Sequence, residues 1–436
     1  GWRLGEPDLV LTMPEAYSVP ADGPDVFRNF VLPIPLSERR FVRAFEFRPG
    51  NPRVVHHVRF LLDESGDLRR KDAADADAGF AGMDAPGAHF PDGHFLGWAP
   101  GKMPTREAYP WPLEPGADLV VQMHLKPSGR REPVQASIGL YFTNTPPSRT
   151  PVLLRLGSKT IDIPAGEPGY DVVDRFELPA DLSLVSIYPH AHYLARDMRV
   201  IAHRPDGRDE LLLHIADWNF NWQDEYRYAH PVPLPAGTQL ELRITYDNSA
   251  GNPANPNHPP VRVLHGPDST DEMGELWLQL LPRDAAGFAA LRQLHRELGQ
   301  REVVADFNLR IQRDPGNAAY HLELGKTLGA LGQQREAFEQ LTRAVELNPQ
   351  LAEAHQFIGI SFLERRLLPD ARAALEQALA LDPSLYRSHL ALGVVAAAEG
   401  NLEEAEEQLQ QAAALNPGDE GIRRQLQAVR KRKAGR

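Results

Sequence analysis

Short hydrophobic runs that alternate with polar residues dominate the first 283 residues, and turn residues close many of them. Pro127-Ser128-Gly129 and Pro205-Asp206-Gly207 are two such turns. Alternation of this kind is typical of strands with one buried face, and regular turns between short strands are typical of β-sandwiches. The predicted strands are Phe41–Phe47, Val54–Leu62, Leu119–Leu125, Ala136–Phe142, Leu182–Tyr188, Met198–His203 and Leu240–Tyr246.

From residue 284 the hydrophobic pattern becomes helical and repeats every 34 residues. The recurring residues are Pro315, Pro349, Pro383 and Pro417; Gly325, Gly359 and Gly393; Ala337, Ala371 and Ala405; and Ala344, Ala378 and Ala412. This is the period of the tetratricopeptide repeat (TPR), in which paired helices approach at small residues and proline ends the second helix. Three repeats, 318–351, 352–385 and 386–419, would form a stack that residues 420–433 cap.

The predicted fold class is therefore multidomain, with two antiparallel β-sandwich domains of jelly-roll type followed by an all-α TPR solenoid. A break near Pro146-Pro147 would divide the sandwiches. The expected domains are an N-terminal sandwich over 1–148, a second sandwich over 149–283, a connecting helix over 284–317 and the TPR array over 318–433.

Composition excludes several classes of protein. The formal net charge of −12 argues against a nucleic-acid partner, because phosphates require a basic face. The absence of cysteine excludes disulfides, thiolate zinc sites and iron–sulfur clusters. No apolar run reaches the roughly 18 residues that a membrane span requires. Because the chain starts at Gly1 rather than at methionine, we expect a processed or trimmed fragment.

The candidate chemistry lies in the histidines, of which the chain has 16. His190 and His192 are two apart, so in a strand both rings point to one face and can share an ion. His56 and His57 are adjacent, so they can share an ion only where the backbone bends or a strand ends. Taken alone, neither pair is a strong signal, and a surface or cross-strand pair is the more common interpretation of each.

Four segments in order along the chain resemble the copper type II, ascorbate-dependent monooxygenases, the family of peptidylglycine α-hydroxylating monooxygenase and dopamine β-monooxygenase. The resemblance covers about residues 8–283, which form two β-sandwich domains in that family. The stretch from Trp222-Gln223 to Met273 resembles bacterial members in particular. The four segments are Val55-His56-His57-Val58, Gln122-Met123-His124, His190-Ala191-His192 and Asp271-Glu272-Met273.

The resemblance implies two separate mononuclear copper sites. It implies that His56, His57 and His124 hold the electron-transfer copper. It implies that His190, His192 and Met273 are the catalytic residues, holding the copper that binds O2 beside the substrate. Imidazole suits both oxidation states of copper, and the thioether favours Cu(I). Without the surrounding motif, Met273 would be interpreted as a core methionine.

Three positions depart from the peptide-amidating branch of the family. Tyr188 stands where that branch has an arginine that binds the substrate carboxylate. Glu275 and Trp277 stand where it has asparagine and tyrosine. The resemblance therefore does not extend to a peptidylglycine or catecholamine substrate, whereas the six metal ligands are unaffected.

Other histidines are interpreted as structural. His89 and His94 lie in a Gly/Pro-rich loop, where a third metal site is the alternative to exposed loop histidines. His321, His355 and His389 recur at the 34-residue period, where we expect them to pack between helices. The expected TPR groove has no basic cluster, which argues against a clamp for acidic peptide termini; an extended peptide or a neighbouring domain is the expected partner. The groove positions are Ala319, Leu322, Lys326, Glu353, Gln356, Ile360, Arg387, Leu390 and Val394.

The expected function is a copper-dependent monooxygenase that hydroxylates a C–H bond of a small or peptide-like substrate with O2 and an external reductant. The family reductant is ascorbate, but a cytochrome or another domain could serve a bacterial enzyme. The alternatives are a non-catalytic copper-binding module joined to a TPR scaffold, and an interaction protein with vestigial sandwiches that binds no copper. Copper handling favours a periplasmic or secreted location.

Overall fold

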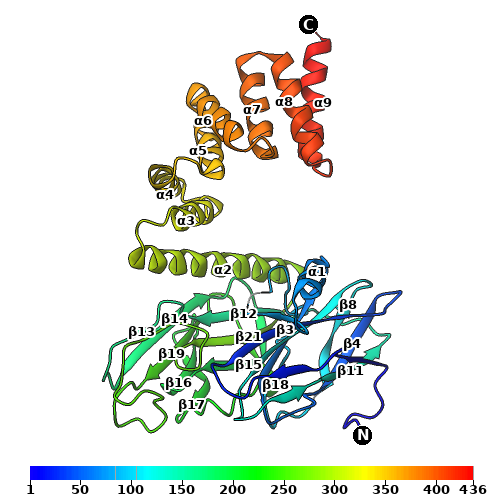
Figure 1. Ribbon diagram of the computed structural model, residues 1–436, viewed down its shortest axis with the longest axis vertical. Coiled ribbons are helices and arrows are strands. Elements are labelled where there is room, and N and C mark those ends of the chain that lie inside the picture. Colours follow the sequence, from blue (N-terminus) through cyan, green and yellow to red (C-terminus); the bar gives the residue numbers. More distant parts are fainter. Residues whose placement is uncertain (84, 105, 436) are drawn as a thin grey trace. The chain divides into compact units, whose positions relative to one another are not determined.

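The computed structural model describes residues 1–83, 85–104 and 106–435 and divides into two compact units, Gly1–Arg296 and Glu297–Arg436 (Figure 1). The first unit consists mainly of antiparallel strands and the second of helices. Among the described residues, no helix combines the length and the apolar character needed to cross a membrane. The strand-rich region and the helical repeats that the sequence predicts are thus both confirmed.

Two antiparallel sheets, which we call the first sheet pair, make up the beginning of the first unit. Their strand orders are β1-β11-β4-β8 and β6-β3-β9-β5-β7, and β2 and β10 form a small separate sheet. Helix α1 (Asp67–Ala74) follows β5. The strands are β1 (Leu9–Thr12), β2 (Tyr17–Val19), β3 (Val26–Pro33), β4 (Arg40–Arg48), β5 (Val55–Asp63), β6 (Phe80–Ala81), β7 (Gly97–Trp98), β8 (Arg106–Leu113), β9 (Asp118–Leu125), β10 (Glu132–Val134) and β11 (Ser137–Thr143).

One hydrophobic core lies between the two sheets of the first sheet pair. Phe47 and Trp111 reach it from the four-stranded sheet, and Phe60 and Met123 reach it from the five-stranded sheet. Phe47 and Phe60 meet edge to face with ring centroids 5.1 Å apart, an arrangement that aromatic quadrupoles favour. The alternation seen in the sequence therefore corresponds to one buried face on each sheet.

A second pair of antiparallel sheets, the second sheet pair, follows. Its strand orders are β12-β21-β15-β18 and β14-β19-β16-β17, with β13 and β20 forming a small separate sheet. Gly274 marks a close approach between the two larger sheets, because a Cβ there would lie 2.0 Å from the Tyr246 hydroxyl. The strands are β12 (Val152–Gly157), β13 (Asp162–Ile163), β14 (Tyr170–Glu177), β15 (Leu182–Ala191), β16 (Ala195–His203), β17 (Asp209–Ile215), β18 (Tyr226–Leu234), β19 (Gln239–Tyr246), β20 (Val263–Leu264) and β21 (Gly274–Pro282).

The second unit is a series of helix pairs. Each predicted repeat contains two helices: α3 with α4, α5 with α6, and α7 with α8. Helix α2 begins in the first unit, and its later part packs Val304, Phe307 and Ile311 against the first helix pair. The helices are α2 (Ala285–Arg313), α3 (Ala318–Ala330), α4 (Gln334–Leu347), α5 (Ala352–Glu364), α6 (Leu368–Leu381), α7 (Tyr386–Glu399), α8 (Leu402–Leu415) and α9 (Glu420–Ala434).

The recurring glycines mark the points where the paired helices touch. A Cβ added at Gly359 would lie 2.7 Å from Cγ of Leu375, and Gly325 and Gly393 face the equivalent leucines in the same way. Real Cβ atoms do not approach carbon this closely, so a side chain here would force the helices apart. The 34-residue glycine period is therefore a packing requirement.

The recurring histidines of the repeats have a structural role. His321 and His389 each place Nδ1 2.7 Å from a glutamine 19 residues later in the chain. The Nε2 atom of each ring lies beside the carbonyl oxygen of the proline six residues earlier, as it does in His355. These rings tie the start of one helix to the preceding turn.

We expect Gly359→Val to destabilise the second unit by about 1–3 kcal/mol, because overpacking a close contact typically costs this much. Urea unfolding followed by the helical circular dichroism signal measures the change. Gly418→Val is the matched control, since a Cβ at Gly418 meets nothing within 4 Å. Equal unfolding midpoints for the two variants would contradict this account of the glycine period.

Candidate metal centre

The first group of predicted ligands lies on two neighbouring strands, β5 and β9. His57 is directly opposite His124 in the antiparallel pairing of these strands. The register shifts between Val55 and His57, which is a bulge at His56. A bulge changes the direction of a side chain within a strand, and this is how adjacent His56 and His57 face the same point.

The three rings of the first group converge through their Nδ1 atoms. The Nδ1 atom of His57 is 3.1 Å from that of His56 and 3.3 Å from that of His124. Ligand atoms of the three residues all lie within 4.8 Å of one another. Three nitrogens bound tetrahedrally to one ion at about 2.0 Å would be about 3.3 Å apart. The arrangement therefore fits one metal ion with three imidazole ligands.

Neighbouring side chains fix the orientation of these rings. The Nε2 atom of His124 is 2.8 Å from the Asp25 carboxylate. An ionised carboxylate can only accept a hydrogen bond, so Nε2 carries the ring proton and Nδ1 keeps its lone pair for the metal. Phe27 stacks on the same ring with centroids 4.4 Å apart. Phe220, from the second sheet pair, stacks on His56 with centroids 4.9 Å apart.

Burial keeps His56 and His57, two rings of the first group, neutral. It lowers the pKa of His56 to about 3, and the nearby Lys126 acts in the same direction. Burial also lowers the pKa of His57 well below its ordinary value, with the neighbouring His124 adding to the effect. Neutral imidazole is the form that binds a metal, so these rings are ready to act as ligands near pH 7.

The second predicted pair lies at the end of β15. His190 and His192 are two residues apart, and their ring centroids are 5.3 Å apart. The Nδ1 atom of His190 is 2.5 Å from the Gln223 side-chain oxygen, and that of His192 is 3.1 Å from the Asp271 carbonyl. Both acceptors are oxygens, so each Nδ1 carries the proton and each Nε2 keeps a lone pair for a metal.

Met273 immediately precedes β21, the partner of β15. The last pair of this ladder is Ala191 with Gly274, so one further step would put His192 opposite Met273 on the same face. The buried Glu272 carboxylate accepts the backbone N–H groups of His192, Leu194 and Met273 at 2.5, 2.8 and 2.9 Å. Burial raises the pKa of Glu272 to about 8. Glu272 thus joins the backbones of two predicted ligands.

The three positions that depart from the peptide-amidating pattern lie next to His190, with Tyr188 and Glu275 buried and Trp277 partly exposed. Glu275 pairs with Arg155 and with Arg59, the latter at 3.9 Å. Burial alone would raise the pKa of Glu275, but these guanidinium groups outweigh it and hold the pKa at about 2. Tyr188 stacks on Phe95 with ring centroids 4.0 Å apart. These positions therefore contribute to an internal ion pair and to an aromatic stack.

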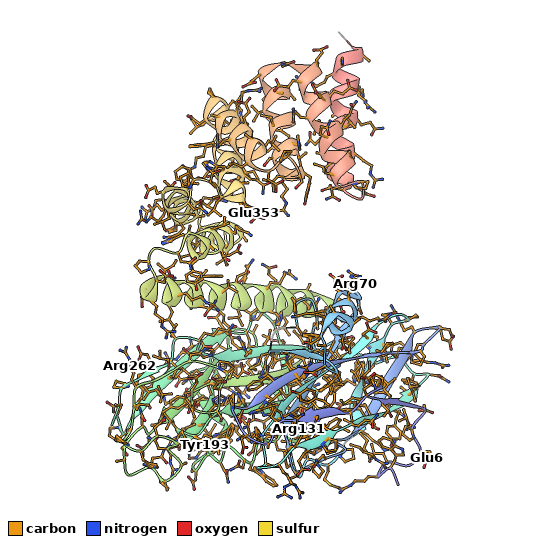
Figure 2. All side chains as sticks on the ribbon, in the orientation of Figure 1. Glu6, Arg70, Arg131, Tyr193, Arg262 and Glu353 are labelled. Atoms are coloured by element: carbon orange, nitrogen blue, oxygen red, sulfur yellow. The ribbon has the colours of Figure 1, made fainter. Side chains whose placement is uncertain are left out.

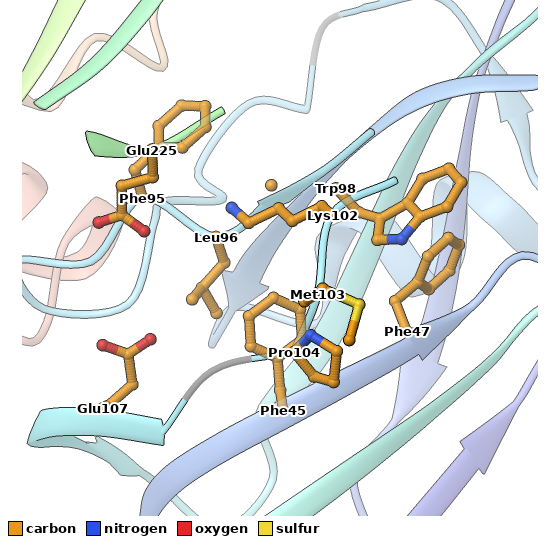
Figure 3. A pocket seen from close by; sticks show the side chains of 11 residues that line it. Phe45, Phe47, Phe95, Leu96, Trp98, Lys102, Met103, Pro104, Glu107 and Glu225 are labelled. Carbon is orange, nitrogen blue, oxygen red and sulfur yellow. The ribbon is translucent and has the colours of Figure 1, made fainter. Parts of the chain in front are cut away.

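A pocket adjoins these positions on the side of Phe95 (Figure 3). Phe47 and Trp98 lie at one side, and the Glu107 and Glu225 carboxylates lie at the other (Figure 3). Among the described residues that line it, none is a predicted metal ligand. The pocket thus has aromatic side chains at one end and, at the other, two carboxylates that both pair with Arg227, and Lys102 also lines it.

Sequence reasoning missed the residues that hold the ligands in place. Asp25, Phe220 and Gln223 contact predicted ligands but lie outside the histidine pattern. Among the described residues, His89 and His94 join no group of three candidate ligands. His94 is buried, with Nε2 3.8 Å from Glu107, whereas the exposed His89 has its ring Nδ1 2.9 Å from the Phe90 carbonyl oxygen. The third-site alternative receives no support from this geometry.

Comparisons with known protein families identify the helical repeats of the second unit. Residues 318–351 and 358–420 match tetratricopeptide repeat families, so this region consists of TPR repeats. Solved structures with similarity include a crystal structure of MamA, at 23% identity, TM-score 0.29, covering 32% of this chain and 84% of that one. A second MamA crystal structure has 23% identity and TM-score 0.29, covering 33% and 78%. No curated protein matches the chain.

We expect Asp25→Ala to weaken Cu(II) binding at the first group by about 10–100-fold, the usual effect of removing a carboxylate that orients a ligating histidine. Competition against a chelator of known affinity measures this. Asp22→Ala is the matched control, because Asp22 is exposed three residues earlier. An unchanged affinity for Asp25→Ala would show that the carboxylate does not orient His124.

The metal-free protein should lose stability as the pH falls from about 6.5 towards 3. His192 has an ordinary pKa of 6.5, which burial lowers to about 3 in the fold. The unfolded chain therefore binds more protons in this window, so acid favours unfolding. Urea unfolding across this range should give a shallower pH dependence for His192→Asn than for the exposed-site control His89→Asn. If the two variants lost stability with falling pH at the same rate, His192 would not be a buried neutral ring in the folded protein.

Proposed function

We propose that this protein is a copper-dependent monooxygenase, which hydroxylates a C–H bond with O2 and two electrons from an external reductant. The observation that carries the proposal is the convergence of three histidine Nδ1 atoms within 3.1–3.3 Å beside a second histidine pair whose Nε2 atoms are oriented for a metal. The order of these ligands along the chain is that of the copper type II, ascorbate-dependent monooxygenases. The finer fold assignment, two β-sandwich domains of jelly-roll type, belongs to the same proposal.

The two groups would have different tasks. When bound, copper supplies one-electron redox chemistry and O2 activation. His56, His57 and His124 offer three imidazoles, a set that suits an ion cycling between two oxidation states. His190, His192 and Met273 offer two imidazoles and a thioether, a softer set that favours Cu(I). Of the two ligand groups, the second would face O2 and the substrate.

The protein groups around the ligands would fix the protonated nitrogen of each ring and limit the access of water. Asp25, Gln223 and the Asp271 carbonyl hold the ring protons on the nitrogens that face away from the metal. His124, His190 and His192 are each at most 5% exposed, which limits access of water to the reacting region. These residues would orient the ligands before any substrate arrives.

The substrate would be bound differently from a peptide carboxylate. Near the three positions that depart from the peptide-amidating pattern, Arg59 and Arg155 are directed at Glu275. The Lys102 ammonium lies 5.8 Å from the Tyr188 ring centroid. The nearby pocket is lined by Phe47, Trp98 and Lys102 together with two carboxylates that both pair with Arg227, and at about 20 Å³ it has no room for a substrate. The small or peptide-like substrate is therefore proposed from the resemblance alone.

The TPR repeats would recruit a protein or peptide partner. In the expected groove, Lys326 pairs with Glu323 and Glu353 at 2.8 and 3.0 Å, so its charge is already balanced. This supports an extended peptide over an acidic chain terminus. A periplasmic or secreted location, with ascorbate or a cytochrome as the electron donor, accompanies the proposal. The second candidate is a non-catalytic copper-binding module joined to the TPR scaffold.

Elemental analysis after copper loading should give two copper ions per chain, and reductant should then drive O2 uptake. Met273→Ala should lower that uptake by more than about 100-fold, a larger effect than that of residues which only orient ligands. Copper at the first group should remain. Met83→Ala, at another half-buried methionine, is the control.

The outcomes separate the candidate functions. Two bound coppers with no reductant-dependent O2 uptake in the wild-type protein would favour the copper-binding module. Absence of stoichiometric copper would refute both candidates and leave an interaction protein. Equal uptake by wild type and Met273→Ala would remove the sulfur from the proposed oxygen site.

A further inference from the structure

We propose that a pocket at one end of the second sheet pair binds a small organic acid, a molecule in which one carboxylate is attached to an apolar body. The pocket has a volume of about 450 Å³. Sites for small molecules usually measure about 300–1,000 Å³. The inference goes beyond the proposed function, since none of the described residues that line this pocket is a predicted metal ligand.

The pocket lies at the opposite end of β15 from His190. Leu182 and Ser183, at the start of β15, line it, whereas His190 is near the end of the same strand. A strand rises about 3.3 Å per residue, so roughly 23 Å of strand separates Ser183 from His190. A molecule bound in the pocket is therefore distinct from any substrate that reacts at the candidate metal centre.

The apolar part of the pocket consists of proline rings on a base of buried leucines. Leu182, Leu234 and Leu281 come from β15, β18 and β21, in which β15 lies between the other two strands. Each of these leucines is at most 4% exposed, so the base is firmly packed. Pro233 and Pro235 also line the pocket and are more exposed. Covering these rings with the apolar body of a ligand removes both surfaces from water, which favours binding.

Arg204 is fixed at the pocket with part of its guanidinium group available. Its Nε and Nη2 atoms donate to the Glu210 carboxylate at 2.8 and 2.5 Å, and Nη2 also donates to the Pro233 carbonyl oxygen at 2.9 Å. No described residue accepts a hydrogen bond from Nη1, so the N–H groups of Nη1 are left for a ligand. Because the protein already holds this side chain in place, binding would cost little of its conformational freedom.

The charges around the pocket favour a single bound negative charge. Arg283 has Asp181 as its charge partner at 3.7 Å, and Arg204 has Glu210. Arg149 also lines the pocket, is exposed and, among the residues that the structure describes, pairs with no carboxylate. One positive charge is therefore unbalanced, on a chain whose formal net charge is −12. A carboxylate supplies the missing charge, and its two oxygens match the paired N–H groups of a guanidinium.

Isothermal titration calorimetry of the full chain without added metal tests the proposal, with phenylbutyrate as the probe. Two further probes separate the charge from the apolar body. Phenylbutyramide has the same body without the charge, and acetate has the charge without the body. We expect each of them to bind at least about tenfold more weakly than phenylbutyrate, because the charged hydrogen bonds and the apolar contact both contribute to affinity.

Arg149→Met should weaken phenylbutyrate binding by about 10–100-fold, the usual effect of losing hydrogen bonds to a charged group. Binding of phenylbutyramide should stay as in the wild type, because methionine keeps an apolar stem. Arg131→Met is the matched control, at an exposed arginine labelled in Figure 2 that does not line the pocket. Thermal unfolding of both variants checks that each is folded.

Equal affinity for phenylbutyrate and its amide would overturn the inference, since the guanidinium groups would then play no part. An affinity unchanged by Arg149→Met would place the acid elsewhere and would overturn it too, as would the absence of binding at millimolar concentrations. Because the titration contains no copper, these outcomes leave the proposed function intact, and a failure of the protein to bind copper leaves this inference intact.

Discussion

The antiparallel pairing of β5 with β9, and of β15 with β21, determines where every candidate ligand lies. The first ladder sets His57 opposite His124, which are 67 residues apart in the chain. The second ladder ends where His192 and Met273 follow its last pair. Because side chains alternate across a strand, a slip of one residue in either ladder would turn the ligands to the opposite face. The hydrophobic cores that fix these registers are thus a condition for any metal chemistry.

Holding neutral imidazoles inside the protein has an energetic cost that the surroundings offset only in part. His124, His190 and His192 each have one ring nitrogen beside an oxygen acceptor, which is Asp25, Gln223 or the Asp271 carbonyl. Burial lowers the pKa of His56, His57, His190 and His192 and so opposes their protonation. Metal binding requires the same neutral form. Ligand preorganisation and the acid sensitivity of the metal-free fold therefore have the same origin.

The strands, the repeats and the ligand candidates were predictable because each has a periodic or local signal. The bulge at His56 was not, since a register shift depends on the partner strand and leaves no pattern in β5 itself. Asp25 and Phe220 were missed because they approach the ligands only through tertiary packing. Glu272 stood inside the recognised segment, but its three backbone partners appear only once β15 and β21 are paired. Helix α1 was missed because it is short and buries only Leu68.

The later part of α2 has a consequence for how this chain can be divided. Val304, Phe307 and Ile311 cover Leu324, Leu328 and Ala337, which belong to the first repeat. The sequence period starts at residue 318, yet the apolar surface of that repeat is completed by a segment upstream of it. A minimal autonomous repeat fragment thus begins near Glu297, because a cut at the period boundary would leave an apolar surface open to self-association.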